Sequence, residues 1–108
     1  MACVCAVVRT NLDKQAITGD FLNQLSTYLV DLLKSNLQNT VLEVETGVAM
    51  LRAGTADPVV NISLHHNCDD LTKQTKQHLA GRMAEFIAHR LPVQTDRVLV
   101  LFVDTRKC

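Results

Sequence analysis

The sequence lacks an excess of charge of either sign. Eleven basic and eleven acidic side chains balance, and neither sign forms a long block, which argues against a partner with a phosphate backbone or an anionic lipid surface. No stretch approaches the roughly 20 consecutive apolar residues of a membrane span. The first residues show neither the basic segment nor the long apolar segment of a secretory signal peptide. We therefore expect a cytoplasmic protein without nucleic-acid or membrane partners.

The sequence also lacks a regular cysteine framework. Its four cysteines, Cys3, Cys5, Cys68 and Cys108, are scattered, which fits a reducing compartment better than a secreted disulfide scaffold. Cys3 and Cys5 share one face of an extended strand, but residues two apart have poor geometry for an ordinary disulfide. We interpret both as small residues of a buried strand. A redox pair or a metal clip is the alternative.

The length of 108 residues and the apolar content of 47% predict one folded domain, residues 1–108. Four apolar stretches, residues 3–8, 40–46, 59–66 and 98–103, are predicted strands. The first and last are apolar at nearly every position, as is typical of strands covered on both faces. In the third, alternation places His66 with the apolar residues and His65 on the opposite face. In the second, Glu43 and Glu45 share a face with Val41.

Two amphipathic helices are predicted between these strands. Thr18 is the expected cap of the first, and Asp69 or Asp70 that of the second, which ends at Pro92. The apolar stripe of the first helix is Phe21, Leu22, Leu25, Tyr28, Leu29, Leu32 and Leu33. That of the second is Leu71, Leu79, Met83, Phe86, Ile87 and Leu91. Glycines at 47 and 54, with Pro58, mark turns between the two halves.

The two halves of the chain, about 1–56 and 57–108, repeat one pattern of strand, helix and strand. A shift of 57 residues lays Val41 on Val98 and Val8 on His65. Each half is a βαβ unit with two parallel strands. The predicted fold is therefore α+β, a four-stranded sheet with two helices on one face.

A sheet covered on one side leaves apolar side chains of the last strand in water. Either Leu99, Leu101 and Val103 or Val98, Val100 and Phe102 would be exposed in a single copy. Full burial of one such side chain is worth about 1.5 to 3 kcal/mol. We therefore expect an oligomer whose sheets face one another.

The order and spacing of several short segments resemble the macrophage migration inhibitory factor and D-dopachrome tautomerase family, from about residue 3 to residue 104. These segments are Thr10-Asn11-Leu12, Phe21-Leu22, Gly47-Val48-Ala49-Met50, Gly54-Thr55-Ala56-Asp57-Pro58, Ser63-Leu64-His65 and Thr95-Asp96-Arg97-Val98. The resemblance implies the tautomerase fold and a homotrimer with a keto-enol tautomerase site between subunits. It also implies a cytokine-like extracellular role without a signal peptide, acting on a protein receptor or partner.

The catalytic base that the resemblance implies is missing. Members of the family expose an N-terminal proline whose neutral secondary amine abstracts a proton next to a carbonyl. The gapless register places Val4 there, and its nitrogen is an amide because residues precede it. A free amine at Ala2 would lie roughly 6 to 7 Å from the required point.

The supporting positions of the resemblance also lack the required chemistry. The family's substrate-binding lysine falls on Ser35, although the neighbouring Lys34 is a candidate for binding substrate carboxylate. The Ser-Ile-Gly segment that lends a backbone donor becomes 66–68, with Asn67 at its centre. The pocket tyrosine and asparagine become Leu99 and Leu101. The aromatic tail and the Cys-x-x-Cys motif of relatives have no counterpart here.

The sequence therefore predicts a catalytically inactive, cytokine-like or protein-interaction module that needs no cofactor or metal. One alternative is a weak phenylpyruvate or dopachrome tautomerase that uses a shifted Ala2 amine or Lys34. Another is a metal or thiol activity at His65, His66 and Cys68, whose imidazole and thiolate groups are zinc ligands. Against it, His65 and His66 project to opposite sides of a continuous strand.

Overall fold

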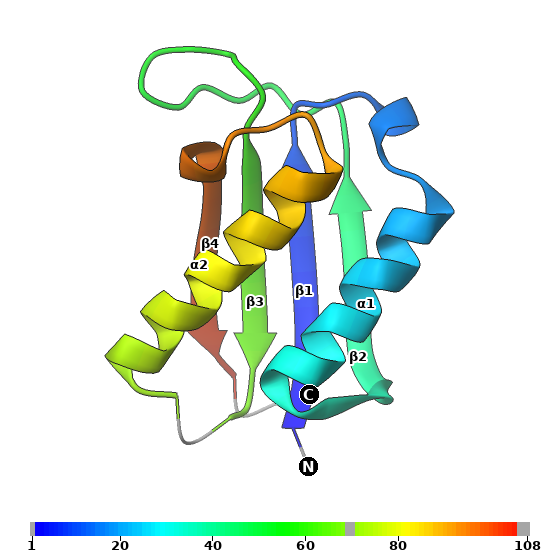
Figure 1. Cartoon of the computed structure of the whole chain (residues 1–108), viewed down its shortest axis with the longest axis vertical. Helices are drawn as coiled ribbons and strands as arrows, with labels where there is room; N and C mark the ends of the chain where they lie inside the picture. The colour runs from blue at the N-terminus through cyan, green and yellow to red at the C-terminus, as the bar shows by residue number, and fades with distance from the viewer. Residues whose placement is uncertain (1, 69–70, 106–108) are drawn as a thin grey trace.

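The computed structural model describes residues 2–68 and 71–105, and it has the predicted alternation of strands and helices (Figure 1). The strands are β1 (Ala2–Thr10), β2 (Ser35–Glu45), β3 (Val60–His66) and β4 (Val98–Asp104). The helices are α1 (Gly19–Leu33) and α2 (Lys73–Arg90), with short 3-10 turns η1 (Lys14–Ala16) and η2 (Thr95–Arg97). Neither helix of the described chain is long and apolar enough to span a bilayer.

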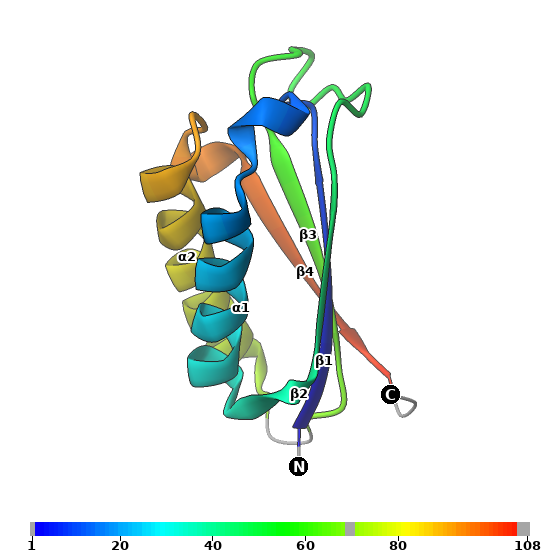
Figure 2. The ribbon, with the colours of Figure 1, turned by 90° about the vertical axis from the view of Figure 1, so that its right-hand side faces the viewer.

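The four strands form one mixed sheet in the order β2-β1-β3-β4. The β1–β2 and β3–β4 pairs are parallel and the central β1–β3 pair is antiparallel, as two βαβ units placed side by side require. Both helices lie on the same face of the sheet (Figure 2). The predicted α+β architecture is confirmed, and in the described part of the chain no segment covers the other face, which we call the open face.

The hydrophobic core lies between the helices and the sheet. Side chains of β1 and β3 alternate in burial, so every second residue faces the helices. The fully buried residues with the largest side chains include Leu25, Leu29, Ile62, Leu64, Met83, Ile87 and His66. The prediction that His66 shares the apolar face of its strand is therefore confirmed.

The two long helices begin at side-chain caps. The Thr18 hydroxyl accepts the Phe21 N–H at 3.1 Å, as predicted. At α2 the Thr72 hydroxyl accepts the Thr75 N–H at 3.1 Å, so the cap expected at Asp69 or Asp70 is wrong. Those two aspartates lie outside the described residues. Several cap-forming residues follow one another here, and a local pattern does not select among them.

The 57-residue repeat is also wrong by one residue in the strands. It superposes Val8 on His65, but Val8 is fully buried beneath the helices and His65 lies half-buried on the open face. It likewise pairs the exposed Val41 with the buried Val98. Because the side-chain period of a strand is two, an odd shift exchanges the two faces. The halves are equivalent in topology, but not at that offset.

One side chain of the second half, Arg97, makes several hydrogen bonds to the connection between the halves, residues 46–59. The Arg97 guanidinium donates to the carbonyl oxygens of Pro58, Asp57 and Arg52 at 2.9, 2.9 and 3.2 Å. Within the loop, the backbones of Arg52 and Thr55 pair with each other. The predicted turn at Gly54 is confirmed, since its φ of 76° lies in the left-handed region that favours glycine.

Thr10 is buried and ties the end of β1 to the start of β3. Its hydroxyl donates to the Val59 carbonyl at 2.8 Å and accepts the Leu12 N–H at 3.1 Å. Thr10→Val keeps the shape but leaves both backbone groups without this partner, so we expect a loss of about 1 to 3 kcal/mol in the free energy of unfolding. Urea denaturation measures it. The exposed control Thr27→Val should change stability by less than about 0.5 kcal/mol, and an equal loss in both variants would contradict the assignment.

Candidate functional site

The position implied for the catalytic base lies in the middle of three paired strands. Val4 pairs with Thr40 of β2 on one side and with His66 of β3 on the other, and its side chain is fully buried in the core. The preceding residue is also fixed, because the Cys3 N–H donates to Asn67 Oδ1 at 2.8 Å. The nitrogen of Val4 is thus a peptide amide inside a sheet, and an amide nitrogen does not act as a general base near neutral pH.

Three of the predicted site residues lie around the start of β1. Ser35 begins β2 opposite Ala2, and its hydroxyl is 3.0 Å from the Thr40 hydroxyl. Asn67 follows β3 and binds the Cys3 N–H. Lys34 is the left-handed cap residue at the end of α1, with φ 54° and ψ 46°, and its side chain is exposed. The lysine is free to reach a ligand, but it is the one basic side chain among these predicted positions.

The other two predicted positions lie on a different strand. Leu99 and Leu101 belong to β4, opposite Asn61 and Ser63 of β3, and they are 36% and 50% exposed on the open face. The whole width of β3 separates them from β1 within one subunit. Their aliphatic side chains offer apolar contact area and no hydrogen-bonding group.

The residues of the alternative imidazole and thiolate cluster are divided between the two faces of the sheet, because His65 and His66 point to opposite sides as expected. His66 points into the core, where its Nδ1 accepts the Cys68 N–H at 3.2 Å and its ring meets Phe102 edge-on at 6.1 Å. His65 lies on the open face instead. Within residues 2–68 and 71–105, no group of three or more His, Cys, Asp or Glu side chains is placed to hold a metal ion. Asp69 and Asp70 lie outside the described residues.

The prediction that Cys3 and Cys5 are core residues is wrong. Cys3 and Cys5 lie half-buried on the open face of β1, while Val4 and Ala6 face the helices. Cys3 takes part in a disulfide bond, which the sequence pattern did not predict, whereas Cys5 is a free thiol. Residues 3–8 are apolar on both faces of the strand, so their sequence does not indicate which face the helices cover.

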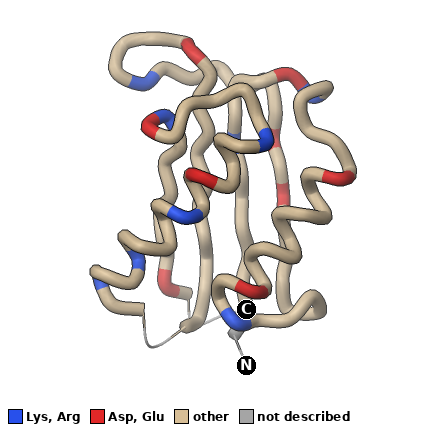
Figure 3. The backbone as a smooth tube through the Cα atoms, viewed as in Figure 1, with Lys and Arg blue, Asp and Glu red and all other residues tan. Residues whose placement is uncertain are grey.

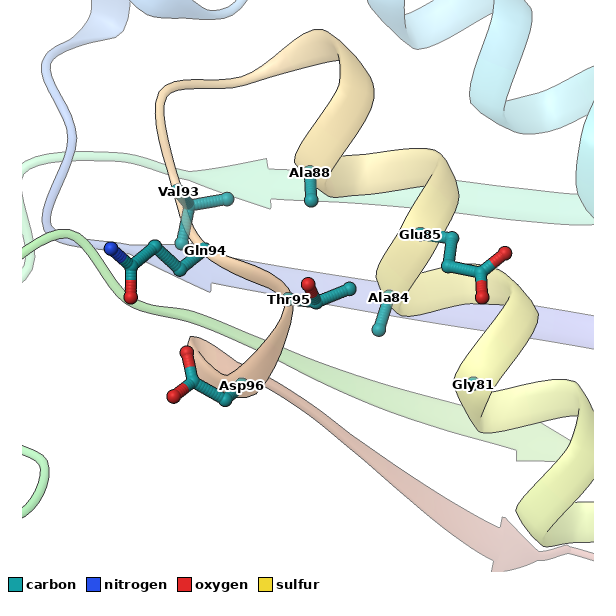
Figure 4. Close-up of a pocket in the computed structure, with 8 residues that line it drawn as sticks. All are labelled: Gly81, Ala84, Glu85, Ala88, Val93, Gln94, Thr95 and Asp96. Atoms are coloured by element: carbon teal, nitrogen blue, oxygen red, sulfur yellow. The ribbon is translucent and has the colours of Figure 1, made fainter.

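A wide, open hollow of about 790 Å³ lies between α2 and the turn η2 (Figure 4). Small residues of α2 form one wall, and residues 93–96 form the other. Its two carboxylates, Glu85 and Asp96, point away from each other (Figure 4), so they do not form the converging pair that acid and base catalysis requires. None of the predicted site positions lines it.

Charged residues are scattered along the backbone of both layers of the molecule, with the two signs interspersed (Figure 3). On the open face, the pair of Arg9 and Glu45 at 3.1 Å lies at the carboxyl end of β1, and both side chains are more than half exposed. An exposed ion pair of this kind contributes about 0 to 1 kcal/mol.

Comparison with known proteins agrees with this topology. The family model described as "Macrophage migration inhibitory factor (MIF)" matches residues 4–108. The chain belongs to the macrophage migration inhibitory factor family. The match begins at Val4.

Individual relatives are distant in sequence and close in fold. The chain is 26% identical over 95 residues to D-dopachrome decarboxylase-B of Xenopus laevis, covering 87% of this chain and 80% of the relative. The structure of macrophage migration inhibitory factor from Oncomelania hupensis superposes with a TM-score of 0.84 at 19% identity, covering 94% of this chain and 86% of that one. The factor from Trichinella spiralis gives 0.85 at 15% identity, with 94% and 88% covered.

Proposed function

We propose that this protein is a family member without tautomerase activity, which acts as a cytokine-like or protein-interaction module. The observation that carries the proposal is the state of the Val4 nitrogen, which is an amide between two paired strands. Without a basic amine at this point, residues 2–5 of the described chain offer no backbone nitrogen that could abstract the proton next to a carbonyl. The apolar Leu99 and Leu101 and the hydroxyl of Ser35 support the same conclusion.

We expect the purified protein to show no turnover of phenylpyruvate or dopachrome above the buffer rate. Ultraviolet absorbance of the phenylpyruvate enol, or visible absorbance of dopachrome, measures it, with an active family member as positive control. Lys34→Ala should leave the result unchanged, because the lysine alone supplies no base at the position of Val4. Turnover that disappears when the N-terminal amine is acetylated would overturn the proposal and favour weak catalysis by a primary amine.

We also propose that the protein is a homotrimer that buries its open face. Exposed apolar side chains gather there on the two outer strands, Val41 on β2 and Leu101 and Val103 on β4, at 52%, 50% and 40% exposure. Large apolar side chains left exposed on an uncovered sheet face are typical of an interaction surface. A second copy offers the same apolar strands, so each subunit supplies what the other needs.

Family membership supports a role outside catalysis as well. A module of this kind would act through contacts with a protein receptor or partner, in the cytoplasm or outside the cell by a route independent of a signal peptide. It would need no cofactor for such contacts. The scattered charge of its surface favours a protein partner over nucleic acid or an anionic membrane.

A further inference from the structure

A groove of about 370 Å³ lies between α1 and α2, and most of the side chains that line it are exposed. Both helices lie on the side of the sheet away from the open face (Figure 2), so an oligomer that buries the open face leaves this groove in solvent. Pockets for small molecules bury roughly 70 to 90% of their ligand, whereas this groove is largely open. Its shape therefore suits an elongated segment of a larger partner.

An aromatic stack lies at the centre of the groove. The rings of Tyr28 on α1 and Phe86 on α2 stack at 4.3 Å with an angle of 21° between their planes. The Arg90 guanidinium lies over the Phe86 ring, 3.7 Å from its centroid, in a favourable cation–π contact. Tyrosine and arginine side chains that are held in this way are typical of the residues that dominate binding energy at protein interfaces.

The Arg90 guanidinium is fixed before any ligand is bound. Its Nε donates to Gln24 Oε1 at 3.0 Å and its Nη1 donates to the Phe86 carbonyl at 3.2 Å. Its Nη2 has no hydrogen-bond partner among residues 2–68 and 71–105, so these donors are available to a carboxylate. A side chain that is already ordered loses little conformational entropy on binding.

The opposite charge lies at the other end of the groove. Asp31 is exposed and forms no hydrogen bond or ion pair with another described residue. Gln24, which holds Arg90, precedes Asp31 by two turns of α1, or about 10 Å at 1.5 Å per residue. Tyr28 lies between them. Along its length the groove therefore offers a cation, an aromatic surface and an anion, and Arg90 and Asp31 are the charged residues among those that line it.

We propose that this groove binds an amphipathic helix of a partner protein. The helix places an acidic side chain at Arg90, an apolar side chain against Tyr28 and a basic side chain at Asp31. Helical residues seven positions apart share one face and are separated by about 10 Å, with residues three or four positions on between them. This pattern is that of helix-in-groove recognition. The proposal rests on the proposed role as a protein-interaction module, and it adds the surface used and the chemistry of the partner.

The test is a selection from a display library of random linear peptides of about 16 residues, long enough for four helical turns. The assembled wild-type protein is the target, and Arg90→Glu is the counter-selection. We expect enriched peptides to carry opposite charges seven positions apart with an apolar residue between them. By fluorescence anisotropy, Arg90→Glu should weaken a synthetic enriched peptide at least about tenfold, because an attraction becomes a repulsion. Replacing the acidic residue of the peptide by lysine should restore its binding to Arg90→Glu.

Asp31→Lys should weaken the same peptide and should be rescued by exchanging the basic residue of the peptide for glutamate. It also decides the outcome if circular dichroism shows that Arg90→Glu does not fold. Lys73→Glu is the matched control, because it makes the same change in charge at an exposed residue of the far end of α2 and should alter affinity less than about twofold.

Four results would overturn the proposal: no peptide enriched over the counter-selection, opposite charges spaced as in an extended strand, an equal loss in Lys73→Glu, or unaltered binding to the folded variants of Arg90 and Asp31. Failure of the proposed function is distinguished by the phenylpyruvate assay on the same preparation. Turnover there would contradict the absence of tautomerase activity and leave the peptide result intact, whereas failure of the selection would leave the catalytic conclusion intact.

Discussion

Leu101→Glu is expected to convert the assembled protein into monomers at micromolar concentration. The side chain is half-exposed on the open face of one subunit, so the substitution should not unfold the chain. In a trimer that buries this face, the change removes apolar burial worth about 1.5 to 3 kcal/mol and places an unpaired carboxylate in the interface. A penalty of about 3 kcal/mol already weakens association by more than 100-fold. Sedimentation velocity measures the mass directly.

Leu51→Glu is the control for this change in charge and size. Leu51 is 74% exposed in the connection between the halves, away from the sheet face. The variant should sediment as the wild-type protein does. If Leu101→Glu remains assembled, or if the wild-type protein is already a monomer at micromolar concentration, the open face is not the interface between copies.

Leu29→Ala is expected to lower the free energy of unfolding by about 2 to 5 kcal/mol. Leu29 has no exposed surface and lies at the centre of the core, on the face of α1 that packs against the sheet. The substitution loses the transfer free energy of the side chain and leaves a cavity that the close-packed surroundings fill only partly. A loss of this size is a large share of the total stability of a small domain. Urea denaturation at fixed protein concentration measures it.

The same substitution at an exposed leucine provides the reference. Leu51→Ala should change the free energy of unfolding by no more than about 0.5 kcal/mol. Fixed protein concentration matters because association adds to apparent stability. A small effect at Leu29, comparable to that at Leu51, would show that α1 does not carry the core as described.

The helices and strands could be predicted because buried apolar residues recur in the sequence with the period of each element. The stripe of α1 and its Thr18 cap follow from spacing alone. The sequence left two alternating sets of β4 residues as candidates for the exposed face. In the structure the exposed set is Leu99, Leu101 and Val103. A strand that is apolar at every position does not reveal which side the helices cover, since both sets satisfy the pattern.

Features that depend on distant segments escaped the sequence. The strand β2 begins at Ser35 rather than near residue 40, because a register shift opposite residues 2–4 accommodates a polar stretch that reads as a loop. There, the Thr40 hydroxyl donates to the Asn36 carbonyl at 2.7 Å. The hydrogen bonds from Arg97 to the carbonyl oxygens of Pro58 and Asp57 join residues about 40 positions apart. No local sequence pattern predicts them.

The assignment of Val4, Leu99 and Leu101 to site positions rests on the family resemblance and stays a prediction. The contacts around these positions could not be predicted. The pairing of Cys5 with His65 across the sheet needs the antiparallel register of β1 and β3, and the repeat offset of 57 residues does not supply it. The hydrogen bond from the Cys3 N–H to Asn67 Oδ1 depends on the same register at the end of β3.

The hold of Arg97 on residues 52–58 limits how this chain can vary in length. Surface connections usually tolerate inserted or deleted residues, because their backbone contacts little else. Here three carbonyl oxygens accept hydrogen bonds from one guanidinium group. Because this group is planar and rigid, it cannot keep all three bonds when the backbone shifts. Adding or removing a residue in this connection between the halves would displace all three carbonyl oxygens from the guanidinium at once. We therefore expect the connection to tolerate no change in length.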